Sequence, residues 1–258
     1  MTFKEPYYQL YISNSSCVFD IRVNDMQAIH FNYPGTVAFD QPINHLMLQS
    51  GKQKLKVKLL PPQDALVLNE RSKIEIKVQV MEAKGDFSVR KEITTLVSPP
   101  LDAKPVWELE LEFEANLPYK LEGWQNSASL KSVPELKQKL FNWYSKMHGI
   151  VARKEFGNFE ALNKKAYEED AVSIYDPSFM SGHLPEVYGY INEPGFKLVP
   201  LDFDALQVHL YADGKVAALH WPDHKPAIYL QYPEEKSFYT LDLFLHQPAA
   251  GTDFEVIR

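Results

Sequence analysis

Lysine occupies every second position from 52 to 58, and this pattern limits the possible folds of the chain more than any other feature. Leu55, Val57 and Leu59 lie between or directly after the lysines. Successive side chains of a β-strand point to opposite faces, whereas a helix would mix the two kinds on every side. The segment therefore predicts a strand with one charged face and one face on a hydrophobic core.

A second segment carries glutamate in the same arrangement, opposite Leu109, Leu111 and Phe113. We expect the two strands to be neighbours, so that each cross-strand pair contributes about 0.2–1 kcal/mol. The stripe could also be a charged docking surface, but a solvated outer face that controls the register is the favoured interpretation. The charged residues are Lys52, Lys54, Lys56 and Lys58 on one strand, and Glu108, Glu110, Glu112 and Glu114 on the other.

Further segments of the first 130 residues alternate in the same way and end at glycine or proline. The strand at 17–23 is expected to pair with 26–31, and the strand at 54–60 with 43–48. Regularly spaced strands with such breaks predict an antiparallel β-sandwich for residues 1–130. The remaining expected strands are 74–81, 87–97 and 106–113.

Two helices are predicted at the start of the remaining part, residues 131–258. Ser132 and Glu135 fit a capping box ahead of the first helix. Asn158 fits the N-cap of the second helix, which should end before Pro177.

Strand and turn signals follow a long stretch at 178–200 that is rich in glycine and proline and predicts an irregular loop. The segment from 206 to 245, closed by 254–257, predicts an antiparallel meander. We therefore predict a mostly β chain with an α+β second part: an N-terminal antiparallel β-sandwich, then two helices packed on the meander.

Composition and charge make several partners improbable. The net charge of -7 gives no basic excess for binding nucleic acid, and no apolar run approaches the ~18 residues of a membrane helix. The single cysteine, Cys17, excludes an internal disulfide and is compatible with a reducing cytoplasm. We expect a cytoplasmic protein, or a periplasmic or secreted one if a leader has been removed.

The one candidate metal site in the sequence surrounds a turn. His220, Asp223 and His224 could bind Zn²⁺ or a similar ion through two imidazoles and a carboxylate. The favoured alternative is that the imidazoles diverge, because His220 ends a strand and His224 sits at a hairpin tip. The sequence has no nucleophile elbow and no phosphate-binding loop. No cofactor is therefore expected, and catalysis is not favoured.

Aromatic residues of the second part are candidates for a recognition surface, since tyrosine and tryptophan serve as interface anchors. Tyr188, Tyr190 and Phe196 fall in the expected loop, and Trp221 lies beside the histidine turn. Core packing is the alternative for each of them.

The order from Ser132 onward, two helices, a long loop and a four-stranded meander, resembles the NTF2-like family of α+β cones. That resemblance implies a curved sheet around a pocket, which catalytic members equip with an acid/base pair. The segment from Ile43 to Leu60 and its flanking strands resembles immunoglobulin-like sandwiches.

The leading functional hypothesis is a non-enzymatic protein-binding module. One version is a bacterial immunity protein, because an acidic protein suits a basic toxin. The first alternative is an NTF2-like domain that binds a small ligand or catalyses a reaction in its pocket. The second alternative is a structural or assembly subunit. A hollow second part would favour the pocket, and a filled one would favour the binder.

Overall fold

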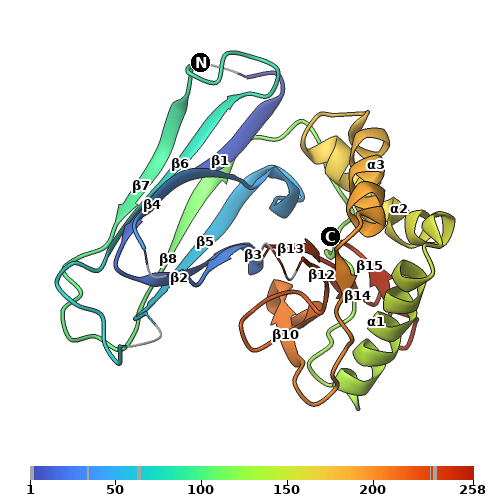
Figure 1. Cartoon of the computed structure of the whole chain (residues 1–258). Coiled ribbons are helices and arrows are strands. Elements are labelled where there is room, and N and C mark those ends of the chain that lie inside the picture. The colour runs from blue at the N-terminus through green and yellow to red at the C-terminus, as the bar shows by residue number, and fades with distance from the viewer. Residues whose placement is uncertain (1–2, 34, 63–64, 233, 235–236) are drawn as a thin grey trace. The chain divides into compact units, whose positions relative to one another are not determined.

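The computed structural model describes residues 3–33, 35–62, 65–232, 234 and 237–258 (Figure 1). Contacts divide the chain into two compact units. The first runs to Leu121 and includes Ser173–Tyr175, and the second contains Glu122–Val172 and Asp176–Arg258. The boundary predicted at 130 thus lies inside the second unit. The described residues form four antiparallel sheets and three α-helices, which confirms the predicted mostly β fold class.

The first unit is built from two four-stranded sheets, which Figure 1 shows as two layers. One sheet has the order β4-β1-β6-β7 and the other the order β3-β2-β5-β8. Leu10 and Val78 of the first sheet, and Phe19 and Val57 of the second, are completely buried. The strands are β1 (Pro6–Ser15), β2 (Val18–Val23), β3 (Met26–Phe31), β4 (Val37–Pro42), β5 (Gly51–Leu60), β6 (Lys73–Glu82), β7 (Lys91–Val97) and β8 (Trp107–Ala115).

The predicted pairing of the lysine and glutamate strands is confirmed. β5 and β8 are antiparallel neighbours, and every lysine of the stripe lies opposite a glutamate. The Nζ atoms of Lys52 and Lys58 lie 3.1 Å from carboxylate oxygens of Glu112 and Glu108. These side chains are largely exposed, so the pairs support the register more than they stabilise the fold.

The strand predicted at 43–48 is wrong. Asn44–Leu46 form a 3-10 helix, and β5 pairs instead with β2 and β8. The reason is the buried side chain of Asn44, whose Oδ1 accepts a hydrogen bond from Tyr8 N and whose Nδ2 donates to Pro6 O. These bonds tie the Asn44 side chain to the backbone of β1. Strands β1 and β4 were not predicted from the sequence.

The second unit begins with helices α1 (Leu136–Ala152) and α2 (Phe156–Ser173). The predicted capping box is wrong, because Glu135 adopts φ 54° as the N-cap and no side chain caps the helix. Asn158 lies inside α2 rather than at its cap.

The irregular loop predicted at 178–200 is also wrong, because helix α3 covers Phe179–Asn192. Pro185 lies inside this helix and removes one backbone donor. Leu184, Val187 and Ile191 nevertheless form a buried stripe with helical spacing. Burial of this stripe outweighs the local breakers.

The strands of the second unit form two sheets rather than one continuous meander. One has the order β10-β11-β14-β15 and the other the order β13-β12-β9. A bridge between His220 and Pro226 links the end of β11 to the approach of β12. The strands are β9 (Lys197–Leu198), β10 (Gln207–Tyr211), β11 (Val216–His220), β12 (Ile228–Tyr232), β13 (Ser237–Leu241), β14 (Leu245–His246) and β15 (Glu255–Val256).

One hydrophobic core joins the three helices to both sheets of the second unit. Tyr144 of α1 is fully buried in it, donates a hydrogen bond to Leu243 O and lies 3.4 Å from Leu219 N. Helix side chains therefore pack against both sheets of this unit. None of the described helices is both long and apolar enough to cross a membrane.

Candidate metal centre

Three histidines of the second unit come together where β10, β11 and the following turn meet. His209 lies in β10 opposite Ala218, and His220 lies two residues beyond Ala218 on β11. Directly opposed residues share a face of the sheet, and so do residues two apart on one strand. His209 and His220 are therefore diagonal neighbours on one face. Leu210 and Leu219 occupy the other face and pack into the hydrophobic core.

His224 reaches the same place through a tight hairpin turn. The backbone N–H of His224 donates to Trp221 O, and Trp221 N donates to Lys225 O, both at 2.8 Å. Pro222 follows Trp221 and supplies the fixed φ that favours such a turn. His224 itself adopts φ 65°, the left-handed region that a three-residue hairpin loop usually fills with glycine. The position has a steric cost of about 1 kcal/mol for any side chain.

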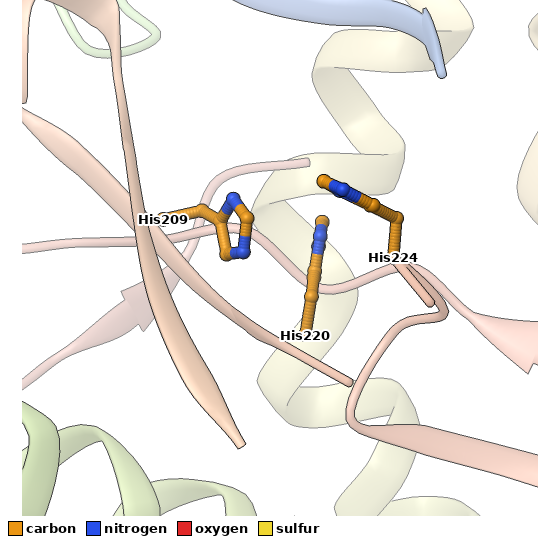
Figure 2. A group of neighbouring side chains, drawn as sticks. All are labelled: His209, His220 and His224. Atoms are coloured by element: carbon orange, nitrogen blue, oxygen red, sulfur yellow. The ribbon is translucent and has the colours of Figure 1, made fainter. Parts of the chain in front are cut away.

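The three imidazoles converge, as Figure 2 shows. One nitrogen from each of His209, His220 and His224 lies within 4.8 Å of the others. The ring centroids of His209 and His220 are 4.9 Å apart, and those of His209 and His224 are 5.5 Å apart. The expectation that the two histidines of the turn diverge is therefore wrong.

The cluster has one buried side and one partly exposed side. His220 is 2% exposed, and its ring lies beside the rings of Tyr211 and Phe244, at centroid distances of 6.3 and 6.4 Å. His209 and His224 are half-buried. An apolar wall thus positions one imidazole, while the other two lie closer to solvent.

Asp223 does not belong to this cluster. Its carboxylate forms an ion pair with Lys225, and that hydrogen bond holds the pKa of Asp223 below its usual value against the effect of burial. His220 and His224 were predicted as candidate ligands from the sequence, whereas His209 was not. The sequence does show a histidine on the neighbouring strand, β10. Placing it beside His220 requires the register between β10 and β11.

The four aromatic residues proposed as a recognition surface contribute mainly to packing. Tyr188 stacks on Phe156, and Tyr190 stacks on Tyr239, with ring centroids about 4 Å apart. The ring of Phe196 lies edge-on to Tyr190. Trp221 donates its indole N–H to Ala227 O. Tyr190 is 37% exposed, so it retains some accessible surface.

A second polar cluster in this unit contains a serine, a histidine and a carboxylate, the residue types of a catalytic triad. Ser127 Oγ lies 2.6 Å from His246 Nδ1, and His246 Nε2 lies 3.9 Å from a carboxylate oxygen of Glu255. Burial, with a smaller contribution from the charge of Lys165, lowers the pKa of His246 to about 4. Ser127 and His246 are both less than 10% exposed. The pair therefore connects the 122–130 segment to β14 without presenting a nucleophile.

Comparison with known proteins gives no match to this chain among family models, curated proteins or solved structures. The resemblances to NTF2-like cones and immunoglobulin-like sandwiches therefore stay predictions from element order.

Replacing His224 with glycine should stabilise the metal-free protein. Glycine adopts the left-handed conformation without steric cost, so the free energy of unfolding should rise by about 0.5–1 kcal/mol. Lys154→Gly is the matched control, because Lys154 is exposed, has φ 57° and follows α1. Urea titration of both variants measures the change. A clear loss of stability in His224→Gly alone would contradict this account of the turn.

The second unit should lose stability in mild acid because of His246. A pKa of about 4 in the fold, against an ordinary value near 6.5, means that the fold favours the neutral imidazole. This stabilisation is present above pH 6.5 and is lost progressively as the pH falls from 6.5 to 4, by up to about 2 kcal/mol between pH 7 and 4.5. His246→Gln cannot titrate, so its loss over that range should be smaller. Equal losses in urea titrations of both proteins would contradict the prediction.

Proposed function

We propose that the second unit binds one divalent transition-metal ion through His209, His220 and His224, with Zn²⁺ the best-fitting ion. The single observation that carries this proposal is the approach of three imidazole nitrogens to within 4.8 Å. Neutral imidazole suits Zn²⁺, Cu²⁺ and Ni²⁺, and three histidines are a known zinc ligand set.

Metal binding requires a small closure of the cluster. Zinc–nitrogen bonds of about 2.0–2.1 Å place tetrahedral ligands about 3.4 Å apart, so nitrogens separated by up to 4.8 Å must approach by up to about 1.4 Å. His220 is fixed against Tyr211 and Phe244, and His209 and His224 are only half-buried. Rotation of these two rings toward His220 supplies the closure. The overall charge of -7 favours the approach of a cation.

Metal binding would also explain why a histidine, rather than glycine, occupies the left-handed position 224 of the turn. Glycine at position 224 would relieve the left-handed strain but would remove a ligand. Strained residues of this kind cluster at functional sites. Under the proposal, metal binding offsets the conformational cost of His224.

Calorimetric titration of the metal-free protein with Zn²⁺ tests the proposal. The wild type should bind one ion per chain near pH 7, where imidazole is largely neutral. His209→Asn and His224→Gly should each weaken binding by at least about 10–100-fold, the loss that even outer-shell partners produce.

His183→Gln is the control for the titration, because His183 lies in α3 against Tyr167 and Phe179. Its affinity should equal that of the wild type. Absence of stoichiometric binding by the wild type, or unchanged binding by both ligand variants, would refute the proposal.

A second candidate function, protein binding, is favoured by a different surface from the one expected. β8 is the last strand of its sheet in the described part of the first unit. It combines outward glutamates with the apolar Leu109, and Val106 directly precedes the strand; both are 40% exposed. Edge strands of this kind accept an added strand from another protein. Each of these glutamates already lies opposite a lysine of β5, so the preference for a basic partner comes from the net charge of the chain, -7.

The opposite end of the same edge has an opening that suits such a partner. A cavity of about 430 Å³ lies between β7 and β8, lined by Lys91, Ile93, Glu114 and Ala115 among others. One side chain of an added strand could enter it. A basic partner is also the kind that an acidic immunity protein would bind.

Leu109→Lys tests this second function. Affinity capture from the source cells should recover the same basic partner with the wild type and with Val172→Lys, but not with Leu109→Lys. Val172 is the matched control, because it is 48% exposed on α2 in the other unit. Recovery of no common partner, or equal recovery by the folded Leu109→Lys variant, would exclude binding at β8.

A further inference from the structure

We infer that the metal site keeps its fourth coordination position open and binds one small anion there, of the carboxylate or azide class. This inference rests on the proposed function, because it concerns the same three histidines. It adds the number of protein ligands, the direction of the vacant position and the chemistry that fills it.

The number of ligands follows from the composition of the cluster. Within the described residues, the group of convergent metal-ligating side chains contains three histidines and neither a carboxylate nor a thiolate. The nearest acidic residue in the sequence, Asp223, directs its carboxylate to Lys225. Structural zinc sites are closed by four protein ligands, whereas three ligands with one exchangeable position are typical of sites that bind water or substrate.

The direction of the vacant position follows from burial. The ring of His220 is enclosed on its own strand face by Tyr211 and Phe244, which lie edge-on to each other at a centroid distance of 5.2 Å. These aromatic rings fill the buried side. His209 and His224 are both half-buried, so the exchangeable position lies on their side of the ion.

The charge of the site selects an anion. Three neutral imidazoles leave the full double positive charge of the ion, whereas a carboxylate or thiolate ligand would reduce it. A partly desolvated cation binds anions more strongly than it would in water. Water occupies the position when no anion is present, and a carboxylate displaces it by forming an oxygen–metal bond as the metal–water bond breaks.

Cobalt(II) in place of zinc reports the coordination directly, because its visible absorption changes with the number and kind of ligands. The metal-free protein is first titrated with Co²⁺ and then, fully loaded, with sodium azide and sodium acetate in separate experiments. The absorption band should change with each anion, should saturate, and should fit one anion per cobalt. Sodium perchlorate at the same ionic strength should leave the band unchanged.

The outcomes separate the two claims. Failure of Co²⁺ to bind, or equal binding by His209→Asn and the wild type, overturns the proposed metal site itself. Stoichiometric Co²⁺ binding that is lost in His209→Asn, with a spectrum that neither azide nor acetate alters, keeps the metal site and overturns the open position. A saturable response to both anions, absent with perchlorate, supports the inference.

Discussion

The backbone ladder between β10 and β11 is the interaction on which the candidate metal centre depends. Its register sets His209 opposite Ala218 and brings His220 to the diagonal position on the same face. A slip of one residue would move His209 to the core face and a leucine to the site. The core side chains Leu210 and Leu219 therefore fix the positions of the imidazoles on the other face. The register between β10 and β11 therefore determines both the packing of the core face and the geometry of the histidine cluster.

The third histidine, His224, comes from a turn rather than from a strand, and its backbone conformation has a free-energy cost that the two strand histidines do not have. His224 is held in a left-handed conformation by two backbone hydrogen bonds of the 221–225 hairpin. The turn would form more readily with glycine, so the side chain is not there for the stability of the turn. The proposed ligand role would account for the residue, and Pro222 contributes by limiting the conformations that compete with the turn.

Sequence reasoning succeeded where the pattern is local. The alternation of Lys54 with Leu55, and of Glu110 with Leu111, predicts each strand and its buried face without knowledge of the fold. Their pairing could be expected from complementary charge, and the structure places Lys54 opposite Glu112. The same argument identified the histidine turn, because His220 and His224 are close in sequence.

Sequence reasoning failed where tertiary packing overrides a local signal. Pro185 and the nearby glycines indicate a loop, yet the buried stripe of Leu184, Val187 and Ile191 holds the segment as a helix. Asn44 interrupts an apolar run because its side chain bonds to the backbone of β1. His209 could not be assigned to the site from the sequence. Its approach to His220 depends on the register between two short strands, and their sequences are compatible with more than one register.

The most direct test of the central claim is a crystal structure of the zinc-loaded protein with anomalous diffraction data at the zinc absorption edge. The account predicts one strong anomalous peak in the second unit, about 2.0–2.1 Å from a ring nitrogen of each of His209, His220 and His224. A peak bonded to fewer than two of these residues, or no peak at this turn in fully loaded crystals, would contradict it.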